Sequence, residues 1–414
     1  MKEKIKSLTA VFYTPILIYF VVFVAISLIA IASATPVARV QYPGLNFVAR
    51  QLIFFGIGMI ATFLVMIFEI KRIRFVRWFF YTLCLSLLLL IFVIGESELI
   101  PYINGATRWI NIPLLPNFEF QIQPSEFMRI ALILVIADVI QKHNEKILHE
   151  KRTFQTDLWL IMKALLVIVV PLALIYDQPD TGITVLILIT TAFMLITAGI
   201  KWTYIFGIGG AGVIIAYTFI TLILYNPDIL TDTGLFHSHQ FDRIHGWHDP
   251  FGSISDVGRH LALGLMAMGS GGILGHGFQS NSLFFPEAHT DFIFAVIGMD
   301  FGMIGSSIVI GVSLLFNFSI LNTAILNRDH YNSHVCVGIF ASLMAQQFWN
   351  FGMVLGLLPI TGVTLPFISH GGSSVLASMI MLGLVLSSHV EGLTIKRNTT
   401  IFREDISFLN ETIV

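Results

Sequence analysis

The sequence predicts an all-α polytopic membrane protein, because its composition and its long apolar runs both favour a bilayer as solvent. Of its 414 residues, 56% are hydrophobic and only 12% are charged, and the mean hydropathy is +0.83. Soluble domains usually carry about 25% charged residues. A water-soluble fold of this length would leave much apolar surface exposed, so we expect lipid to surround most of the chain.

Apolar segments long enough to cross a bilayer recur along the chain. A spanning helix needs about 20 predominantly apolar residues. The first segment is too long for the hydrophobic region of a cleaved signal, so we expect a retained anchor. We expect about ten transmembrane helices, at residues 12–34, 48–68, 77–95, 125–141, 158–176, 182–200, 203–224, 291–322, 333–355 and 372–393.

The distribution of positive charge sets the expected orientation. Most of the 23 lysines and arginines fall on one side of the membrane if the N-terminus is cytoplasmic, and cytoplasmic loops are the ones enriched in these residues. Both termini are therefore expected in the cytoplasm, in agreement with an even number of helices. The formal net charge of -2 predicts no nucleic-acid partner, and the two cysteines predict no disulfide framework.

Two long loops are expected on the outer side, at 96–124 and 225–290. Loops longer than about 12–15 residues are usually functional or disordered. The second contains apolar stretches such as Leu261–Met268, which predict a large folded extracellular loop with helices at the membrane surface. We expect residues 1–414 to form a single transmembrane domain, with these two loops forming its active face.

Asp291 is the strongest candidate for chemistry. It lies where the long outer loop enters the eighth predicted span, and ionisable residues in such positions often mark function. Glu287 and His289 are close by, which gives a cluster suited to general acid–base work. The alternative is structural, because Thr290 or Asp291 at this position would also cap the helix N-terminus.

Three outer residues are candidates for binding a substrate, two of them through an anionic group. Arg108 and Arg243 lie in the outer loops, and arginine suits bidentate binding of phosphate. Trp109 follows Arg108 and is a candidate for stacking on a sugar. Their structural alternatives are a surface ion pair for each arginine and an interfacial anchor for the tryptophan.

Several polar motifs have a structural explanation as their default. Ser125 after Pro124 is expected to cap the fourth span, and Asp and Thr in 177–182 to cap the sixth. The run Gly269–Gly277 lacks the lysine of a phosphate-binding P-loop and predicts a tight backbone turn. Two prolines in 359–374 predict a broken or re-entrant segment.

These residues leave two functional classes open. The first is an enzyme that acts on a lipid-linked phosphate at the outer face, and the second is a transporter of a polar or amphipathic solute. A transporter should place ionisable residues near the bilayer midplane and often shows inverted repeats. Few charges lie within the predicted spans and no repeat is visible, which favours an enzyme.

Seven motifs of the chain resemble those of a known family. They occur in the order of that family and cover nearly the whole length of the chain. The motifs are Asn104-Gly-Ala-Thr-Arg-Trp-Ile110, Gln123-Pro-Ser-Glu-Phe-Met128, Gln178-Pro-Asp-Thr-Gly182, Gln240-Phe-Asp-Arg-Ile244, Gly269-Ser-Gly-Gly272, Pro286-Glu-Ala-His-Thr-Asp-Phe-Ile-Phe294 and Gly356 through Ser374. They are similar to those of the SEDS family, which comprises RodA, FtsW and SpoVE. The form of the first motif and the chain length are more similar to RodA.

The resemblance implies a peptidoglycan glycosyltransferase of the bacterial cytoplasmic membrane. Such an enzyme polymerises lipid II into glycan strands at the outer face, for cell elongation and shape in the RodA case, and works with a class B penicillin-binding protein. Asp291 is then expected to be catalytic, with Mg or Mn as a candidate cation held by Asp291 and Glu287. We expect no organic cofactor. The predicted substrate-binding residues are Arg108, Trp109, Arg243, Glu287, Gln240 and Ser373.

Three alternatives to an elongation polymerase stay open at this level. One is a lipid II flippase, one is a division-type polymerase similar to FtsW, and one is a non-catalytic scaffold for the partner synthase. A β-linkage formed from an α-phosphate inverts the anomeric centre, so a single displacement suffices if a base removes the acceptor proton. We expect Asp291 to be that base and the arginines to stabilise the leaving pyrophosphate.

Overall fold

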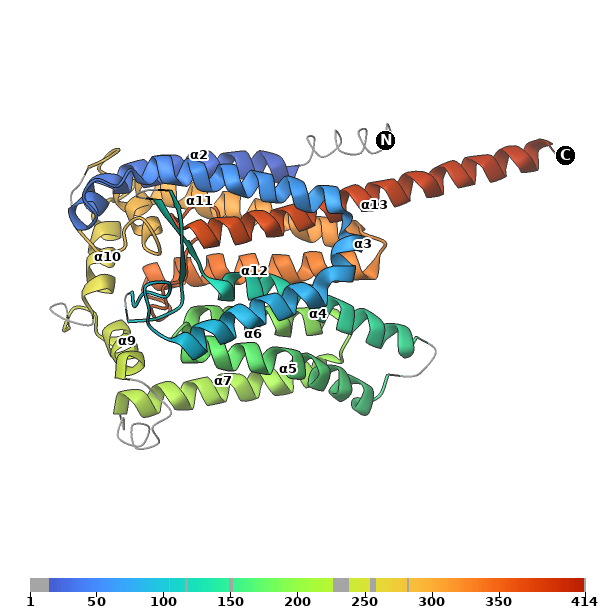
Figure 1. Ribbon diagram of the computed structural model, residues 1–414, viewed down its shortest axis with the longest axis horizontal. Helices are drawn as coiled ribbons and strands as arrows, with labels where there is room; N and C mark the ends of the chain where they lie inside the picture. The colour runs from blue at the N-terminus through green and yellow to red at the C-terminus, as the bar shows by residue number, and fades with distance from the viewer. Residues whose placement is uncertain are drawn as a thin grey trace.

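Long helices run side by side along most of the molecule (Figure 1). The computed structural model describes residues 15–103, 105–115, 118–148, 152–225, 238–253, 258–280 and 283–412. The long helices are α2 (Pro15–Gln41), α3 (Phe47–Ile94), α4 (Pro124–Lys146), α5 (Phe154–Asp177), α6 (Thr181–Thr197), α7 (Trp202–Tyr225), α11 (Ile293–Leu326), α12 (His330–Val354) and α13 (Gly372–Thr412). This nearly all-helical architecture confirms the predicted fold class.

Six helical segments in the described part of the chain are long and apolar enough to cross a membrane. They are Pro15–Val40, Phe47–Phe68, Arg72–Ile94, Phe154–Asp177, Ile293–Leu326 and Gly372–Gly392. Each of the ten predicted spans coincides with a described helix over most of its length, and α3 contains two of them because it turns back on itself (Figure 1). The multi-pass membrane class is therefore confirmed, and the number of ten crossings stays a prediction.

Helix α4 lies inside the bundle, where it packs against α3, α5, α6 and α12. Its first two turns bury Glu126 and Arg129, whose carboxylate and guanidinium pair at 2.9 Å. Asp138 is 2% exposed and pairs with three cations. Charged residues within spans usually face the bundle interior and pair with one another, so the polar character of α4 follows from its central position.

The long outer loop contains two short helices, α9 (Ser238–His248) and α10 (Arg259–Ser270), which lie across the same end of the bundle (Figure 1). Their presence confirms the prediction of a folded loop for the part of it that the structure describes. Three stretches of this loop, 226–237, 254–257 and 281–282, lie outside the described residues.

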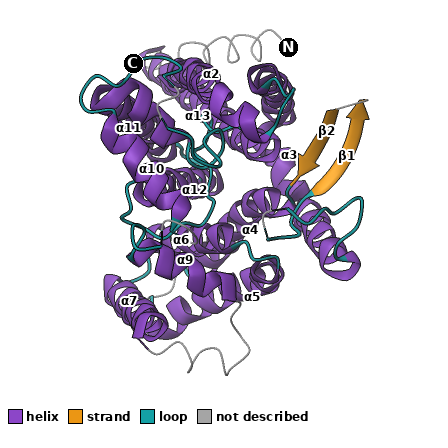
Figure 2. Cartoon of the chain, turned by 90° about the vertical axis from the view of Figure 1, so that its left-hand side faces the viewer, coloured by secondary structure: helices purple, strands orange, loops and turns teal. Residues whose placement is uncertain are grey.

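The first outer loop contains a β-hairpin that the sequence analysis did not predict. Strands β1 (Ile110–Leu115) and β2 (Phe118–Ile122) pair antiparallel, and the hairpin stands beside α3 (Figure 2). Apolar and polar residues alternate in 118–122, which is the period of a strand. Phe120 is 7% exposed and packs edge-on against Phe54 of α3 at 5.7 Å between ring centroids, which fixes the hairpin to the bundle.

The glycine-rich run after α10 packs backbone to backbone against a break in α11. At Gly302 the φ angle is +66°, so the helical hydrogen bonds are interrupted there. The amides of Met303 and Ile304 donate instead to the carbonyls of Gly272 and Ile273, at 2.9 and 3.3 Å. The turn predicted for this run is present, and it supplies the hydrogen bonds that the break removes from α11.

Replacing Gly302 by alanine is expected to lower the thermal stability of the protein strongly. The residue has a left-handed φ, and a Cβ there would overlap the backbone of Ile273 and Gly275. We expect a loss of about 3 kcal/mol in the free energy of unfolding, measured by thermal unfolding in detergent. Gly311→Ala in the same helix is the control. Its Cβ would meet nothing within 4 Å, so this variant should match or slightly exceed wild type.

The segment between α12 and α13 is not helical and is buried in protein, as the sequence predicted for a broken segment. Val363, Leu365 and Ile368 are at most 4% exposed. Side chains of the neighbouring helices satisfy its carbonyls, with Ser27 Oγ donating to Ile368 O at 2.8 Å and Gln51 Nε2 to Ser369 O at 3.3 Å. Irregular backbone at membrane depth requires such partners.

Candidate active site

Asp291 lies just before α11, against the irregular segment that precedes α13. A Cβ built on Gly362 would come within 3.9 Å of Asp291 Oδ2, so the carboxylate faces a residue that has no side chain. Asn350 of α12 holds the two segments together. Its Nδ2 donates to Asp291 O at 2.8 Å and to Val363 O at 2.7 Å, so the backbone beneath the carboxylate is fixed.

The capping alternative for Asp291 is wrong in this structure. The N-cap of α11 is Phe292, and no side chain caps this helix. Instead the Thr290 hydroxyl lies 2.7 Å from Glu287 Oε2 and 3.0 Å from Asp291 Oδ1, between the two carboxylates. Glu287 itself has a positive φ of +55°, a strained conformation for a residue other than glycine. The carboxylate of Asp291 is therefore free of a structural role at the helix end.

The surroundings of Asp291 disfavour its charged form. Burial, followed by the nearby Glu287 carboxylate, raises the pKa of Asp291 to about 7. The Thr290 hydroxyl and the positive charge of Arg108 act in the opposite direction. A carboxyl with this pKa exchanges a proton near neutral pH, as a general base requires.

His289 packs among aromatic rings beside the carboxylates, and the Glu287 charge only partly offsets its burial. It is 5% exposed and lies against Phe47, Tyr42 and His370, with ring centroids 4.5, 5.6 and 5.8 Å away. Burial lowers the pKa of His289 below its usual value. The aromatic packing assigns it a structural role beside the site.

Asp180 connects the first outer loop to the start of α6. It caps this helix through an amide hydrogen bond from Ile183 at 3.4 Å, as the sequence predicted. Its other oxygen accepts hydrogen bonds from Gln123 Nε2 at 2.7 Å and Ser125 Oγ at 3.0 Å. The predicted capping role of Ser125 is wrong, because the N-cap of α4 is Gln123 with no side-chain bond and the serine hydroxyl donates across to α6.

The two candidate arginines converge on this corner from different loops. Arg108 Nη1 lies 3.5 Å from Asp180 Oδ1, and its guanidinium covers the Trp109 ring at 4.3 Å. Arg243 of α9 donates to Thr181 Oγ1 at 3.5 Å. Burial and the positive charge of Arg108 lower the pKa of Arg243. Asp180 and Asp291 are the carboxylates that act on Arg243. Two guanidiniums fixed in one corner favour the binding of an anion there.

The arginine corner and Asp291 belong to one site. A Cβ on Gly182 would lie 3.2 Å from Thr361 O, so the first turn of α6 touches the segment that carries Gly362. Gly362 in turn faces Asp291. The site therefore places a carboxyl of raised pKa next to two guanidiniums, at the end of the bundle that Figure 2 presents to the viewer.

The remaining predicted residues occupy different positions. Glu287 is beside Asp291, whereas the side chain of Gln240 lies outside the described residues. The Ser373 hydroxyl donates to Gln121 O at 2.6 Å and accepts from the Gln123 amide at 2.9 Å. These bonds anchor β2 to the start of α13, and a role of Ser373 in substrate binding stays a prediction.

Sequence reasoning did not select Asp180 or Asn350 as site residues. Asp180 lies in the Gln178–Gly182 motif, whose polar residues were interpreted as helix caps alone. Asn350 had a weaker signal, because it is one of three side-chain amides in the ninth span, with Gln346 and Gln347. Both hold the site together from elements distant in the sequence.

No group of three or more His, Cys, Asp or Glu side chains that could hold a metal ion occurs in the described part of the chain. The Asp291 and Glu287 carboxylates, joined through the Thr290 hydroxyl, still form a pair of hard oxygen donors. Magnesium is commonly bound by one or two carboxylates together with substrate phosphates and water. The pair therefore fits a cation that arrives with a phosphorylated substrate.

Comparison with known proteins places this chain among cell-wall proteins. The sequence profile of the FtsW/RodA/SpoVE group, described as a cell cycle protein, matches residues 13–392. The chain is 31% identical to the probable peptidoglycan glycosyltransferase FtsW of Wigglesworthia glossinidia brevipalpis, over 94% of this chain and 97% of the relative. It is 32% identical to the stage V sporulation protein E of Bacillus subtilis, over 82% and 86%.

Two solved structures have a similar fold. A chain from a peptidoglycan synthase complex that coordinates polymerization and crosslinking aligns with a TM-score of 0.71 at 24% identity, covering 91% of this chain and 97% of that chain. The rod shape determining protein RodA of Thermus thermophilus aligns with a TM-score of 0.61 at 24% identity, covering 90% and 95%. At this identity the likeness concerns the fold.

Proposed function

The chain belongs to the SEDS family of FtsW, RodA and SpoVE proteins, and from this premise we propose that it polymerises lipid II at the outer face of the membrane with Asp291 as catalytic base. It is a multi-pass protein of the cytoplasmic membrane and a peptidoglycan glycosyltransferase. The observation that supports the proposed site is the carboxyl of Asp291, with a pKa of about 7, next to Arg108 and Arg243. The outer loops at 96–124 and 225–290 form the proposed active face.

In the proposed reaction a sugar hydroxyl of one lipid-linked chain attacks the anomeric carbon of another. The Asp291 carboxylate takes the hydroxyl proton as the new glycosidic C–O bond forms. The bond from the anomeric carbon to the pyrophosphate breaks, and its electron pair leaves with the pyrophosphate. Arg108 and Arg243 stabilise that developing charge, as fixed cations do in a site shielded from water.

The cation and the stacking residue complete the proposal. Asp291 and Glu287 would hold Mg or Mn, which would add positive charge at the leaving group. Trp109, whose ring already lies beneath the Arg108 guanidinium, is proposed to guide the sugar or lipid part of the substrate. Gln240 and Ser373 complete the proposed substrate-binding set.

We assign the enzyme to cell elongation and propose a class B penicillin-binding protein as its partner. The Asn104–Ile110 motif and the chain length, both similar to RodA, support elongation. Curated relatives named FtsW and SpoVE support the glycosyltransferase activity without distinguishing elongation from division. The fold likeness to a chain of a peptidoglycan synthase complex supports a partner. Depletion in rod-shaped cells distinguishes the roles, because round cells are expected for elongation and filaments for division.

The activity is tested with purified protein, lipid II and a class B partner whose transpeptidase is blocked. Glycan strands from wild type, and none from Asp291→Asn purified in the same way, are the expected result. The same protein in vesicles, with lipid II on one side, tests the flippase alternative. Movement of lipid II across the vesicle without any glycan strands would overturn the proposal and assign a transport function.

The pH dependence of the activity is expected to follow the ionisation of Asp291. Only the carboxylate acts as base, so kcat/KM should fall about tenfold per pH unit below a pKa of about 7. Glu287 raises this pKa, so Glu287→Gln should shift the acid limb to lower pH by about half a unit or more. Arg108 lowers the pKa, so Arg108→Gln should shift the limb to higher pH. If the acid limbs of both variants coincide with that of wild type, Asp291 is not the titrating group.

A further inference from the structure

A hollow of ≈ 450 Å³ lies far from the proposed active site, at the opposite end of α4. It is lined by Val139, Lys142, Glu145 and Lys146 of α4 and by Lys163 of α5. Helix α4 begins next to Asp180 and ends at Lys146, and its 23 residues make it about 33 Å long. The hollow therefore lies on the side predicted to face the cytoplasm, separate from the glycosyltransferase site.

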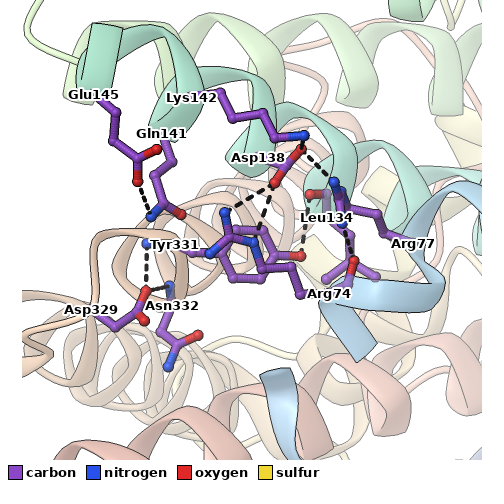
Figure 3. Close-up of polar contacts among 10 residues, drawn as sticks. All are labelled: Arg74, Arg77, Leu134, Asp138, Gln141, Lys142, Glu145, Asp329, Tyr331 and Asn332. Carbon is purple, nitrogen blue, oxygen red and sulfur yellow. Dashed lines mark hydrogen bonds and ion pairs between the residues drawn. The ribbon is translucent and has the colours of Figure 1, made fainter. Parts of the chain in front are cut away.

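Positive charge at this hollow exceeds the negative charge that faces it. Glu145 accepts a hydrogen bond from Gln141 Nε2 at 2.7 Å, along its own helix. Lys142 pairs with Asp138 at 2.9 Å, but that single carboxylate also pairs with Arg74 at 3.2 Å and Arg77 at 2.7 Å (Figure 3). One buried acid thus faces three cations, and most of the charge of Lys142 is not neutralised.

The other two lysines have no carboxylate partner within the described ranges. Lys163 Nζ lies 5.6 Å from the centroid of the Trp159 ring, and Lys146 is exposed at the end of α4. Lys142 and Lys146 are four residues apart, so their ammonium groups occupy the same face of the helix and repel each other. A bound anion would relieve this repulsion and use donors from two helices.

The apolar surface beside the hollow distinguishes a lipid from a soluble anion. Helix α5 is one of the segments that can cross the membrane. On this helix Trp159, Met162 and Leu166 flank Lys163 and are 58%, 42% and 65% exposed. In a membrane such side chains face acyl chains, and Lys163 would reach toward the headgroup level from within the span. A cluster of lysines that suits a phosphate and an apolar surface that suits acyl chains therefore lie next to each other.

We propose that this hollow binds the phosphate group of an anionic phospholipid from the cytoplasmic leaflet, with its acyl chains along Trp159 and Leu166. The three lysines supply the positive charge, and the apolar face of α5 supplies the contact for the chains. Basic pockets between helices on the cytoplasmic side bind anionic headgroups in this way. Free phosphate shares the headgroup chemistry but makes no use of the apolar face.

The proposal is tested by native mass spectrometry of the full chain in detergent, titrated with phosphatidylglycerol or phosphatidylcholine. Wild type should retain phosphatidylglycerol and release phosphatidylcholine. Each lysine near a lipid headgroup contributes about fivefold to affinity, so the Lys146→Gln/Lys163→Gln double variant should bind phosphatidylglycerol roughly 25-fold more weakly. Lys201→Gln is the matched control, because Lys201 is exposed and does not line the hollow.

Two results would overturn the proposal. The first is equal binding of phosphatidylglycerol by wild type and the double variant, once their thermal unfolding without lipid shows that both are folded. The second is complete displacement of the lipid by millimolar inorganic phosphate, which would identify the hollow as a site for a free anion. Retention of the lipid under the same phosphate supports a headgroup site. Because the assay measures only lipid binding, its outcome is independent of the proposed polymerase activity.

Discussion

Replacing Asp291 by asparagine is expected to lower the rate of glycan polymerisation by about 10³-fold. The amide keeps the size of the side chain but is unable to take a proton from the acceptor hydroxyl. Glu287 is the nearest other carboxylate, but its hydrogen bond with Thr290 and its own backbone turn hold it beside the site. It should therefore not replace the lost base.

Glu98→Gln is the matched control for Asp291→Asn, because Glu98 is an exposed acid of the first outer loop. It should retain the wild-type rate. An Asp291→Asn protein that polymerises at the wild-type rate would remove Asp291 from the mechanism. Lipid II binding should persist in this variant, since the proposed arginine contacts are unchanged.

Stability measurements separate loss of the base from loss of the fold. The ordinary aspartate pKa of 3.8 is raised to about 7 in the folded chain. Between these values the folded state keeps a proton that the unfolded state has lost, so wild type loses stability as the pH rises from about 4 to 7. The Asp291→Asn variant has no ionisable group at this position, so it does not lose stability in this way as the pH rises. It should unfold at a higher temperature than wild type at pH 8, and the difference should vanish toward pH 4.

The helices were predictable because their information is local. Apolar runs of sufficient length identify spans in a bilayer, and each of the ten predicted segments coincides with a described helix over most of its length. The hairpin at 110–122 was missed because two strands of five or six residues give a weak pattern next to spans of twenty or more.

The site was predictable in composition but not in geometry. Asp291, Arg108 and Arg243 were selected from charge and position, whereas their convergence depends on Asp180 and Asn350. These two residues act across 72 and 59 positions of sequence, from Arg108 to Asp180 and from Asp291 to Asn350. Contacts at such separations leave no periodic pattern in a single sequence. The exchange of hydrogen bonds around Gly302 was likewise outside what a local pattern indicates.

Replacing Arg243 by glutamine is expected to lower kcat/KM for polymerisation by about 10²-fold. Arg243 is held by Thr181 at 3.5 Å, and its surroundings disfavour its charge in the free protein. A pyrophosphate leaving group would stabilise the charged guanidinium, most strongly as negative charge develops on the pyrophosphate in the transition state. The effect should therefore fall mainly on kcat. Arg243→Lys keeps the charge but loses the planar fork, so its rate should lie between those of wild type and the glutamine variant.

The control for Arg243→Gln is Arg259→Gln, because Arg259 is an exposed cation at the start of α10. This change should leave kcat/KM unaltered, which excludes a general effect of positive charge on the outer face. The decisive comparison is the double variant of Arg108 and Arg243. If both guanidiniums hold the same pyrophosphate, the combined loss should be smaller than the product of the single losses. Independent, multiplicative losses would show that the two arginines act on different groups, which would contradict a shared leaving-group site.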